Sequence, residues 1–168
     1  MLLNADIGGH QKVCSYSFVL AHEKDLLAHE QVDHGRVTEL IAEITKDGVL
    51  KYPIIADKNS MVILDGHHRV RALTTLGCLF IPTYLVDYCD DNIIVTTWGD
   101  ASEASRSGRK KLVEREPLRE VTKDVVVMAA LTGRLLPPKT SRHVWPWPYE
   151  ERPVPINILK GLTSSITC

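Results

Sequence analysis

The stretch "DGHHRVRAL", residues 65–73, follows the apolar run "MVIL" and constrains the possible folds more than any other segment. The apolar run predicts a strand, whereas Val70 and Leu73 have the spacing of one helical face. Gly77 is placed to end that helix, which we expect over about 67–76. A strand that leads through an acid and a glycine into a helix favours a fold with helices packed on a sheet.

The residues at this junction could bind an anion. Gly66 allows a sharp turn close to a ligand, and the first backbone N–H groups of a helix attract anions. His67 and His68 could donate hydrogen bonds to phosphate oxygens from the first turn. Arg69 leans toward the apolar face of the helix, where a buried cation needs an anionic partner. That partner is either a bound anion or Asp65, and the pattern alone leaves both alternatives open.

The composition argues against several classes of function. The chain has 168 residues, 44% apolar and 24% charged, with a formal net charge of −1. A near-neutral chain is not attracted as a whole to nucleic acid or to an anionic membrane, so we expect neither partner. The four cysteines form no C-x-x-C pair, and we find no leader peptide or membrane-spanning run. We therefore expect a cytoplasmic protein with reduced thiols.

The remaining periodicity predicts a mixed α+β fold with one main sheet, in a single domain over 1–168. A small, polar and basic stretch at about 99–117 indicates a variable loop. The tail over 135–155 is so rich in proline that we expect no regular structure there. The expected strands are 13–20, 52–57, 61–65, 81–88 and 93–98, and the expected helices are 37–48, 67–76 and 118–132.

Three other features could carry chemistry, although each has a plainer interpretation. Glu30 belongs to a His-Glu pair in a loop, where a glutamate is usually a solvated acid. Trp98 ends a predicted strand, where an aromatic residue is more often part of the core. The segment "PPKTSRH" suits a carboxylate or phosphate, but by itself it also reads as a solvated basic loop. Its polar residues are Lys139, Thr140, Ser141, Arg142 and His143.

Several segments together resemble one known family. "ILDGHHRVRALTTLG" is similar to the signature helix of the ParB/sulfiredoxin superfamily. "HEQVDHGRVTELIAEI", "VDYCDDNIIVTTW" and "GRLLPPKTSRHVWPW" resemble segments of the free L-serine kinases, in the same order and over about 26–147. The resemblance implies one ParB/sulfiredoxin-like domain, with a small mixed sheet flanked by helices. It also implies a segment at about 133–168 that closes over the substrate.

Departures from the neighbouring families narrow the expected function. Sulfiredoxins have a nucleophilic cysteine where this chain has His67, so we do not expect sulfinic-acid reduction. Partitioning ParB proteins read "GERR" at the positions of 66–69 and continue into helix-turn-helix segments, which we do not expect here. Some serine kinases carry a long insertion before the closing segment. The short stretch in this chain leaves both ATP and ADP open as the phosphoryl donor.

The resemblance implies a role for each candidate residue. Glu30 would accept the proton of the serine hydroxyl, and Trp98 would help to hold the serine. Residues 139–143 would surround the serine carboxylate or the transferred phosphoryl group. The nucleotide-binding residues would be Asp65, Gly66, His67, His68 and Arg69. The catalytic residues would be Glu30, Asp65, His68 and Arg69, with Asp65 also a candidate ligand of Mg²⁺.

We therefore expect a phosphotransferase that moves a phosphoryl group from ATP or ADP to the hydroxyl of L-serine. The product, O-phospho-L-serine, would serve cysteine synthesis or another phosphoserine-dependent pathway. Phosphoryl transfer needs positioning and charge neutralisation more than covalent help, and no P-loop or protein-kinase signature occurs in the sequence. The alternative is a nucleotide-gated ParB-like DNA-binding or regulatory module without kinase activity.

Overall fold

A mixed four-stranded sheet organises the fold. The computed structural model describes residues 15–97 and 121–161. The sheet has the order β1-β5-β3-β4, in which β3 runs parallel to β5 and the other two pairs are antiparallel. The four strands are β1 Ser17–His22, β5 Phe80–Val86, β3 Ile54–Asp57 and β4 Ile63–Asp65.

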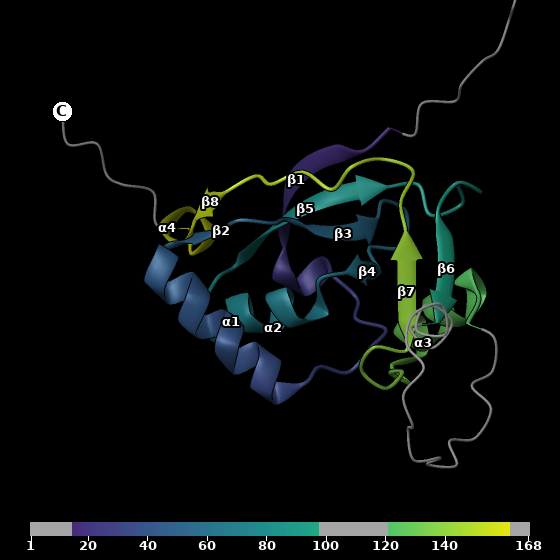
Figure 1. Cartoon of the computed structure of the whole chain (residues 1–168), viewed down its shortest axis with the longest axis horizontal. Helices are drawn as coiled ribbons and strands as arrows, with labels where there is room; N and C mark the ends of the chain where they lie inside the picture. The colour runs from purple at the N-terminus through teal and green to yellow at the C-terminus, as the bar shows by residue number, and fades with distance from the viewer. Residues whose placement is uncertain (1–14, 98–120, 162–168) are drawn as a thin grey trace, which may run out of the picture.

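Helices and two small sheets complete the described ranges (Figure 1). The helices are η1 Glu23–Asp25, α1 His34–Asp47, α2 His67–Thr75, α3 Lys123–Thr132 and α4 Ile156–Leu159. The small sheets pair β2 Val49–Leu50 with β8 Val154–Pro155, and β6 Ile94–Thr97 with β7 Ser141–Val144. None of the described helices has the length and apolar character needed to cross a membrane.

Strand β3 is buried along its whole length because apolar groups cover both faces of the sheet. Ile54 packs into a cluster with α1, α2 and α4, whereas Ile55 packs into a second cluster with β5 and α3. Because β4 pairs with β3 and leads directly into α2, the start of α2 lies next to this buried strand. The prediction of a mixed α+β fold with one main sheet is confirmed.

Most expected elements form, with shifted boundaries. Gly48 ends α1 in the left-handed conformation, at φ 70°, as its position in the sequence predicts. Helix α3 begins at Lys123 rather than 118, because the side chain of Thr122 accepts a hydrogen bond from the backbone of Val125 and caps it.

The prediction that the proline-rich tail lacks regular structure is wrong. Four consecutive residues without proline form β7, which pairs with β6 from Ile94↔Val144 to Thr97↔Ser141. Farther on, β8 and α4 also lie in or directly after this tail. The prolines flank β7 instead of interrupting it, and Pro155 lies in a two-residue strand of a small sheet, where a missing N–H is tolerated.

Candidate functional site

The first turn of α2 is held against the sheet by a close backbone approach at Gly66. This residue has φ 106°, and a Cβ placed on it would lie 2.5 Å from Cγ2 of Ile54. No side chain caps the helix at this end. The free N–H groups of the first turn are therefore available to an anion, as the sequence predicts for a strand-to-helix junction.

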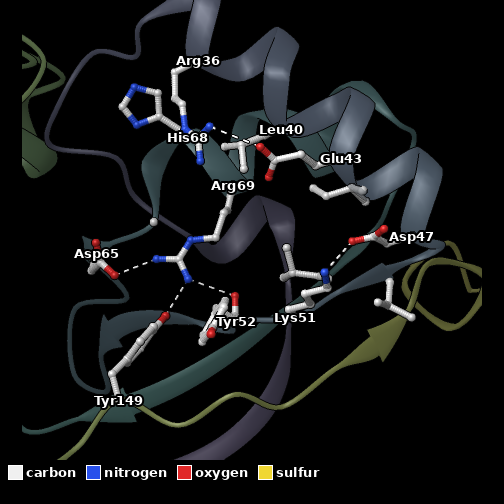
Figure 2. A pocket seen from close by; sticks show the side chains of 14 residues that line it. Arg36, Leu40, Glu43, Asp47, Lys51, Tyr52, Asp65, His68, Arg69 and Tyr149 are labelled. Atoms are coloured by element: carbon white, nitrogen blue, oxygen red, sulfur yellow. Dashed lines mark hydrogen bonds and ion pairs between the residues drawn. The ribbon is translucent and has the colours of Figure 1, made fainter.

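A pocket of about 670 Å³ opens beside this turn, between α1, α2 and β2 (Figure 2). We call it the α1–α2 pocket. Leu40, Ile44 and Leu50 give it an apolar wall, and the rings of Tyr52 and Tyr149 stack at 6.0 Å on another side. Charged residues and one histidine line the remainder: Arg36, Glu43, Asp47, Lys51, Asp65, Arg69 and His68. An apolar wall with convergent polar groups is typical of a small-molecule site.

Arg69 lies at the base of this pocket and makes an internal ion pair. Its Nη2 donates to Oδ2 of Asp65 at 2.6 Å, and its Nη1 donates to the Tyr149 hydroxyl at 2.5 Å. The carbonyl oxygens of Tyr52 and Pro53 accept two further bonds from Nη1. The structure thus contains the Arg69–Asp65 pair that the sequence left as one of two alternatives. A direct contact of Arg69 with a phosphate stays a prediction.

Glu30 lines a second pocket, of about 490 Å³, that also borders α2. We call it the Glu30 pocket, and His34, His67 and Arg71 are among its other residues. The loop that carries Glu30 is tied down by a parallel bridge to Leu136. Since Gly66 and His68 line the first pocket and His67 lines the second, the first turn of α2 separates the two.

The carboxyl group of Glu30 is buried against Ser141. Its Oε1 lies 2.6 Å from both the backbone nitrogen and the Oγ of Ser141. Burial raises the pKa of Glu30, and the hydrogen bonds from Ser141 and from the backbone of Lys139 and Thr140 oppose that rise. A glutamate with a raised pKa at the edge of a pocket is a candidate general base.

His29 lies beside this carboxyl group, with its Nε2 3.7 Å from Oε1 of Glu30, and two further neutral histidines lie beside His29. Burial lowers the pKa of His29 to about 4 and that of His143 to about 3, and it lowers the pKa of His67 well below the ordinary value. The ring of His29 lies 4.5 Å from that of His67 and 6.0 Å from that of His143. The Nε2 of His143 lies 2.8 Å from the hydroxyl of Tyr88.

The two histidines of the "DGHHR" stretch hold the loop before α1. His67 Nε2 accepts from the backbone N–H of His29 at 3.2 Å, and His68 Nε2 accepts from that of Asp33 at 3.0 Å. Both Nε2 atoms are therefore acceptors, so Nδ1 carries the proton in each neutral ring. Donation from these histidines to phosphate oxygens, as the sequence suggests, would come from Nδ1.

Strand β7 divides the residues of the "PPKTSRH" segment between its two faces. Ser141 and His143 face inward toward the buried histidines, whereas Arg142 is exposed on the opposite face. Thr140 is buried and donates to the carbonyl oxygen of Pro137. Lys139 is exposed and has φ 58°. The structure therefore does not bring these five residues around one point.

Other expected site features are placed as follows. Trp98 and the expected loop at 99–117 lie outside the described residues, and so does the end of the closing segment, 162–168. Within 15–97 and 121–161, no group of three or more His, Cys, Asp or Glu side chains could hold a metal ion. Asp65 exposes 47% of its side chain at the rim of the α1–α2 pocket, so its assignment as a Mg²⁺ ligand stays a prediction.

Sequence reasoning missed two residues of this region. His29 is fully buried in contact with Ser141, and its only sequence signal is its place beside Glu30. Tyr149 contributes a hydroxyl to Arg69 from the proline-rich tail, where an aromatic residue between prolines gives no periodic signal.

Comparisons with known proteins agree with the resemblance drawn from the motifs. An ATP-dependent L-serine kinase from Staphylothermus marinus is 32% identical over 105 residues, which are 60% of this chain and 42% of that protein. An ADP-dependent L-serine kinase from Thermococcus kodakarensis is 30% identical over 95 residues, or 51% of this chain and 39% of that protein. A ParB-like protein from Sulfolobus acidocaldarius is 43% identical over 84 residues, half of this chain and 42% of that protein. These matches span about two fifths of the relatives' length.

Solved structures show the same fold. A free serine kinase in complex with AMP has a TM-score of 0.68 at 20% identity, covering 87% of this chain and 94% of that chain. A conserved hypothetical protein from Pyrococcus furiosus has the same TM-score at 19% identity, covering 86% and 97%. No protein-family model matches the chain. The chain is thus a relative of L-serine kinases and of a ParB-like protein in sequence, with the fold of the free serine kinases.

Proposed function

We propose that the chain is a free L-serine kinase that transfers a phosphoryl group from ATP or ADP to the serine hydroxyl. One observation carries the proposal: an uncapped helix N-terminus stands between a nucleotide-sized pocket and a buried glutamate. The similarity to proteins named L-serine kinases supports it. The enzyme would act in the cytoplasm, and its product would feed cysteine synthesis or another phosphoserine-dependent pathway.

In this proposal the nucleotide occupies the α1–α2 pocket. Its phosphates approach Gly66 and the first turn of α2, where N–H groups and the helix dipole favour negative charge. Arg36 and Lys51 on the same pocket add positive charge, although each is paired with an acid of α1. Binding of ADP and AMP by solved free serine kinases of the same fold supports an adenine nucleotide here.

Magnesium would enter with the nucleotide. Asp65 offers a partly exposed carboxylate at the pocket rim, which suits an ion that takes one or two carboxylates together with phosphate oxygens. The bound ion would supply neutralisation of phosphate charge. Arg69 holds Asp65 in place by its ion pair at 2.6 Å.

The serine would bind on the side of Glu30. The carboxylate form of Glu30 would accept the hydroxyl proton as the oxygen attacks phosphorus, and Trp98 would help to hold the amino acid. The buried residues Ser141 and Thr140 would help to shield this side from water. The role of positioning is large because phosphoryl transfer needs little covalent help from a protein.

The test is an incubation of the purified chain with Mg²⁺, L-serine and either nucleotide, with O-phosphoserine and ADP or AMP measured as products. We expect Glu30→Gln to lower turnover by about 100-fold or more, because general base catalysis is lost, while nucleotide affinity stays unchanged. Phosphoserine formation at a near-normal rate by this variant would contradict the assignment of Glu30. No product from the unchanged chain with either nucleotide would contradict the kinase proposal itself.

The 43% identity to a ParB-like protein supports a second candidate, a nucleotide-gated DNA-binding or regulatory module. Retention on duplex DNA that weakens as salt rises would favour it, because phosphate contacts release counterions. Nucleotide binding without turnover would favour a regulatory role. No retention at low salt, together with phosphoserine formation, would exclude this candidate.

A further inference from the structure

Four buried groups form a continuous chain of hydrogen bonds beside the Glu30 pocket. His29 Nδ1 lies 2.7 Å from the carbonyl oxygen of Ile63, and His29 Nε2 lies 2.8 Å from Ser141 Oγ. Ser141 Oγ in turn lies 2.6 Å from Oε1 of Glu30. His29 is fully buried, and Glu30 and Ser141 each expose 8% of their surface. His29 is therefore shielded from solvent, and its two ring nitrogens take their hydrogen-bond partners from the protein.

The number of protons in this series of hydrogen bonds can be counted from the carbonyl oxygen of Ile63, where the series ends. A carbonyl oxygen only accepts, so Nδ1 of His29 must carry a proton, and Nε2 of a neutral His29 is then an acceptor. Ser141 Oγ has one proton, which it can donate either to His29 or to Glu30. If it donates to His29, the Ser141–Glu30 contact joins two acceptors, and if it donates to Glu30, the Ser141–His29 contact does so. Both contacts are hydrogen bonds only when Glu30 or His29 carries one additional proton.

We propose that Glu30, Ser141 and His29 form a proton relay. In the structure the relay holds one proton more than the same three residues would hold with Glu30 as a carboxylate and His29 as a neutral imidazole. We call these three residues the Glu30 relay. Its role in the reaction rests on the proposed serine kinase function, whereas its proton count rests on the hydrogen-bond chain alone. His29 and Ser141 act through Glu30 and are positioning residues.

The extra proton has two places in the relay. In one form Glu30 is a carboxylic acid that donates to Ser141, and the serine hydroxyl donates to His29. In the other, His29 is an imidazolium and Glu30 a carboxylate, with the hydroxyl donating to Glu30. Burial raises the pKa of Glu30 and lowers that of His29, and both shifts favour the first form.

The surrounding groups also favour an uncharged His29. His67 from α2 and His143 from β7 face it, and a positive charge on any of the three would lower the pKa of the others. Lys139 and Thr140 affect the pKa of Glu30 through their backbone N–H groups, and the ammonium group of Lys139 is not among the causes of the shift. The relay is therefore the place where this cluster can hold a proton at the least electrostatic cost.

The relay gives the proton of the substrate a destination. In the reacting state Glu30 is a carboxylate and His29 is neutral. As the serine O–H bond breaks and its oxygen bonds to phosphorus, the bond from phosphorus to the bridging oxygen of the nucleotide breaks. The shortened nucleotide leaves with that electron pair, and Glu30 takes the serine proton. In the favoured form Glu30 keeps this proton and donates it in a hydrogen bond to Ser141 Oγ, while Ser141 donates its own to His29 Nε2. The charge balance is kept, because Ser141 is unchanged and the net gain is one proton on the Glu30 relay.

The hydrogen-bond chain of the structure therefore corresponds to the relay after it has gained a proton. One proton must leave before Glu30 can act as a base again. This step predicts that kcat/KM rises with pH through an apparent pKa above the ordinary value of a glutamate.

The first experiment counts the protons in the ligand-free protein near neutral pH. Infrared difference spectra between the unchanged chain and Glu30→Gln report a carboxylic acid at Glu30, and ¹⁵N NMR reports protonation of each nitrogen of His29. A carboxylic acid at Glu30, or a His29 ring with both nitrogens protonated, supports the relay. A Glu30 carboxylate beside a singly protonated His29 overturns it.

The second experiment separates a relay from a substrate contact. We expect Ser141→Ala to lower kcat by about 10- to 100-fold and to change the pH profile, with little change in the KM for serine. Ser141→Thr keeps the hydroxyl and should restore most of kcat. A rise in KM at constant kcat would overturn the relay, because it would mark Ser141 as a binding group only.

Thr83→Val is the matched control for this experiment. Thr83 is fully buried in β5 and its hydroxyl donates to the carbonyl oxygen of Ile81 at 2.8 Å, away from the relay. It should lose stability as Ser141→Ala does but keep kcat and the pH profile. If the unchanged chain makes no phosphoserine, the serine kinase proposal fails, and the spectroscopic proton count still decides for or against the relay.

Discussion

Gly66 is needed both for packing in the fold and for the shape of the candidate site, because it approaches Ile54 closely and also lines the α1–α2 pocket. It has φ 106° at the junction of β4 and α2, and its Cα faces the side chain of Ile54 in the fully buried strand β3. The side chain of Ile54 has little room to move aside, because it packs in a buried cluster with residues of α1, α2 and α4. The position therefore excludes any side chain, and the same exclusion keeps the backbone of the first turn open to the α1–α2 pocket.

We expect Gly66→Ala to lower the free energy of unfolding by about 2–4 kcal/mol, the sum of backbone strain and the clash with Ile54. Urea denaturation measures the change. Gly48→Ala is the control, since Gly48 has φ 70° but nothing within 4 Å of the added Cβ, and it should cost only about 1 kcal/mol. Equal losses in the two variants would contradict the close approach at Gly66.

Single residues also show the limits of reading this site from sequence. The helical wheel predicts that Arg69 needs an acidic partner, and Asp65 provides it four positions away. His29 gives no comparable signal, because its partner Ser141 lies 112 positions later. Local spacing identifies pairs that lie a few positions apart, whereas contacts between distant segments depend on how the sheets assemble.

At the scale of elements, the sequence predicts the helices and strands that are defined by patterns between neighbouring residues. The periodicity of α1 and its terminal glycine, and the β3–β4 pair around a short turn, follow from patterns within about ten residues. Strand β7 could not be predicted in this way, because a four-residue strand among prolines depends on β6 for its hydrogen bonds. The same pairing puts Ser141 beside Glu30.

The start of α1 gives a prediction at this scale. The side chain of Asp33 accepts from the backbone N–H of Arg36 at 2.8 Å and caps the helix. We expect Asp33→Ala to lower the free energy of unfolding by about 1 kcal/mol, and Asp33→Asn to retain most of the stability. Urea denaturation at neutral pH distinguishes them. If Asn destabilises as much as Ala, the charge of Asp33 rather than its cap is what matters.

At the scale of the whole molecule, the buried histidines make stability depend on pH. The pKa of His29 is about 4 in the folded protein and that of His143 about 3, against 6.5 in an unfolded chain. Between these values the unfolded chain binds more protons than the folded one, so acid favours unfolding. Glu30 opposes this, because its raised pKa lets the folded protein hold a proton that the unfolded chain has released.

We therefore expect the free energy of unfolding to reach its maximum near pH 6.5 and to fall as the pH drops from 6.5 toward 4. The slope should be on the order of 1–3 kcal/mol per pH unit, since two or three histidines act against one glutamate. Urea midpoints measured from pH 4 to pH 8 test this. The variant His143→Gln should flatten the slope, and a slope that is unchanged in it would contradict a neutral His143 in the fold.

The hydroxyl of Tyr149 has a consequence for the order in which the protein is made. It meets Arg69, 80 positions earlier, so one wall of the α1–α2 pocket comes from the last part of the described chain. Ribosomes deliver the chain from its N-terminus, and α1 and α2 emerge long before this wall. Until Tyr149 emerges, the partners available to the guanidinium of Arg69 are Asp65 and the carbonyl oxygens of Tyr52 and Pro53. A nascent chain therefore cannot enclose a ligand in this pocket until residue 149 has left the ribosome.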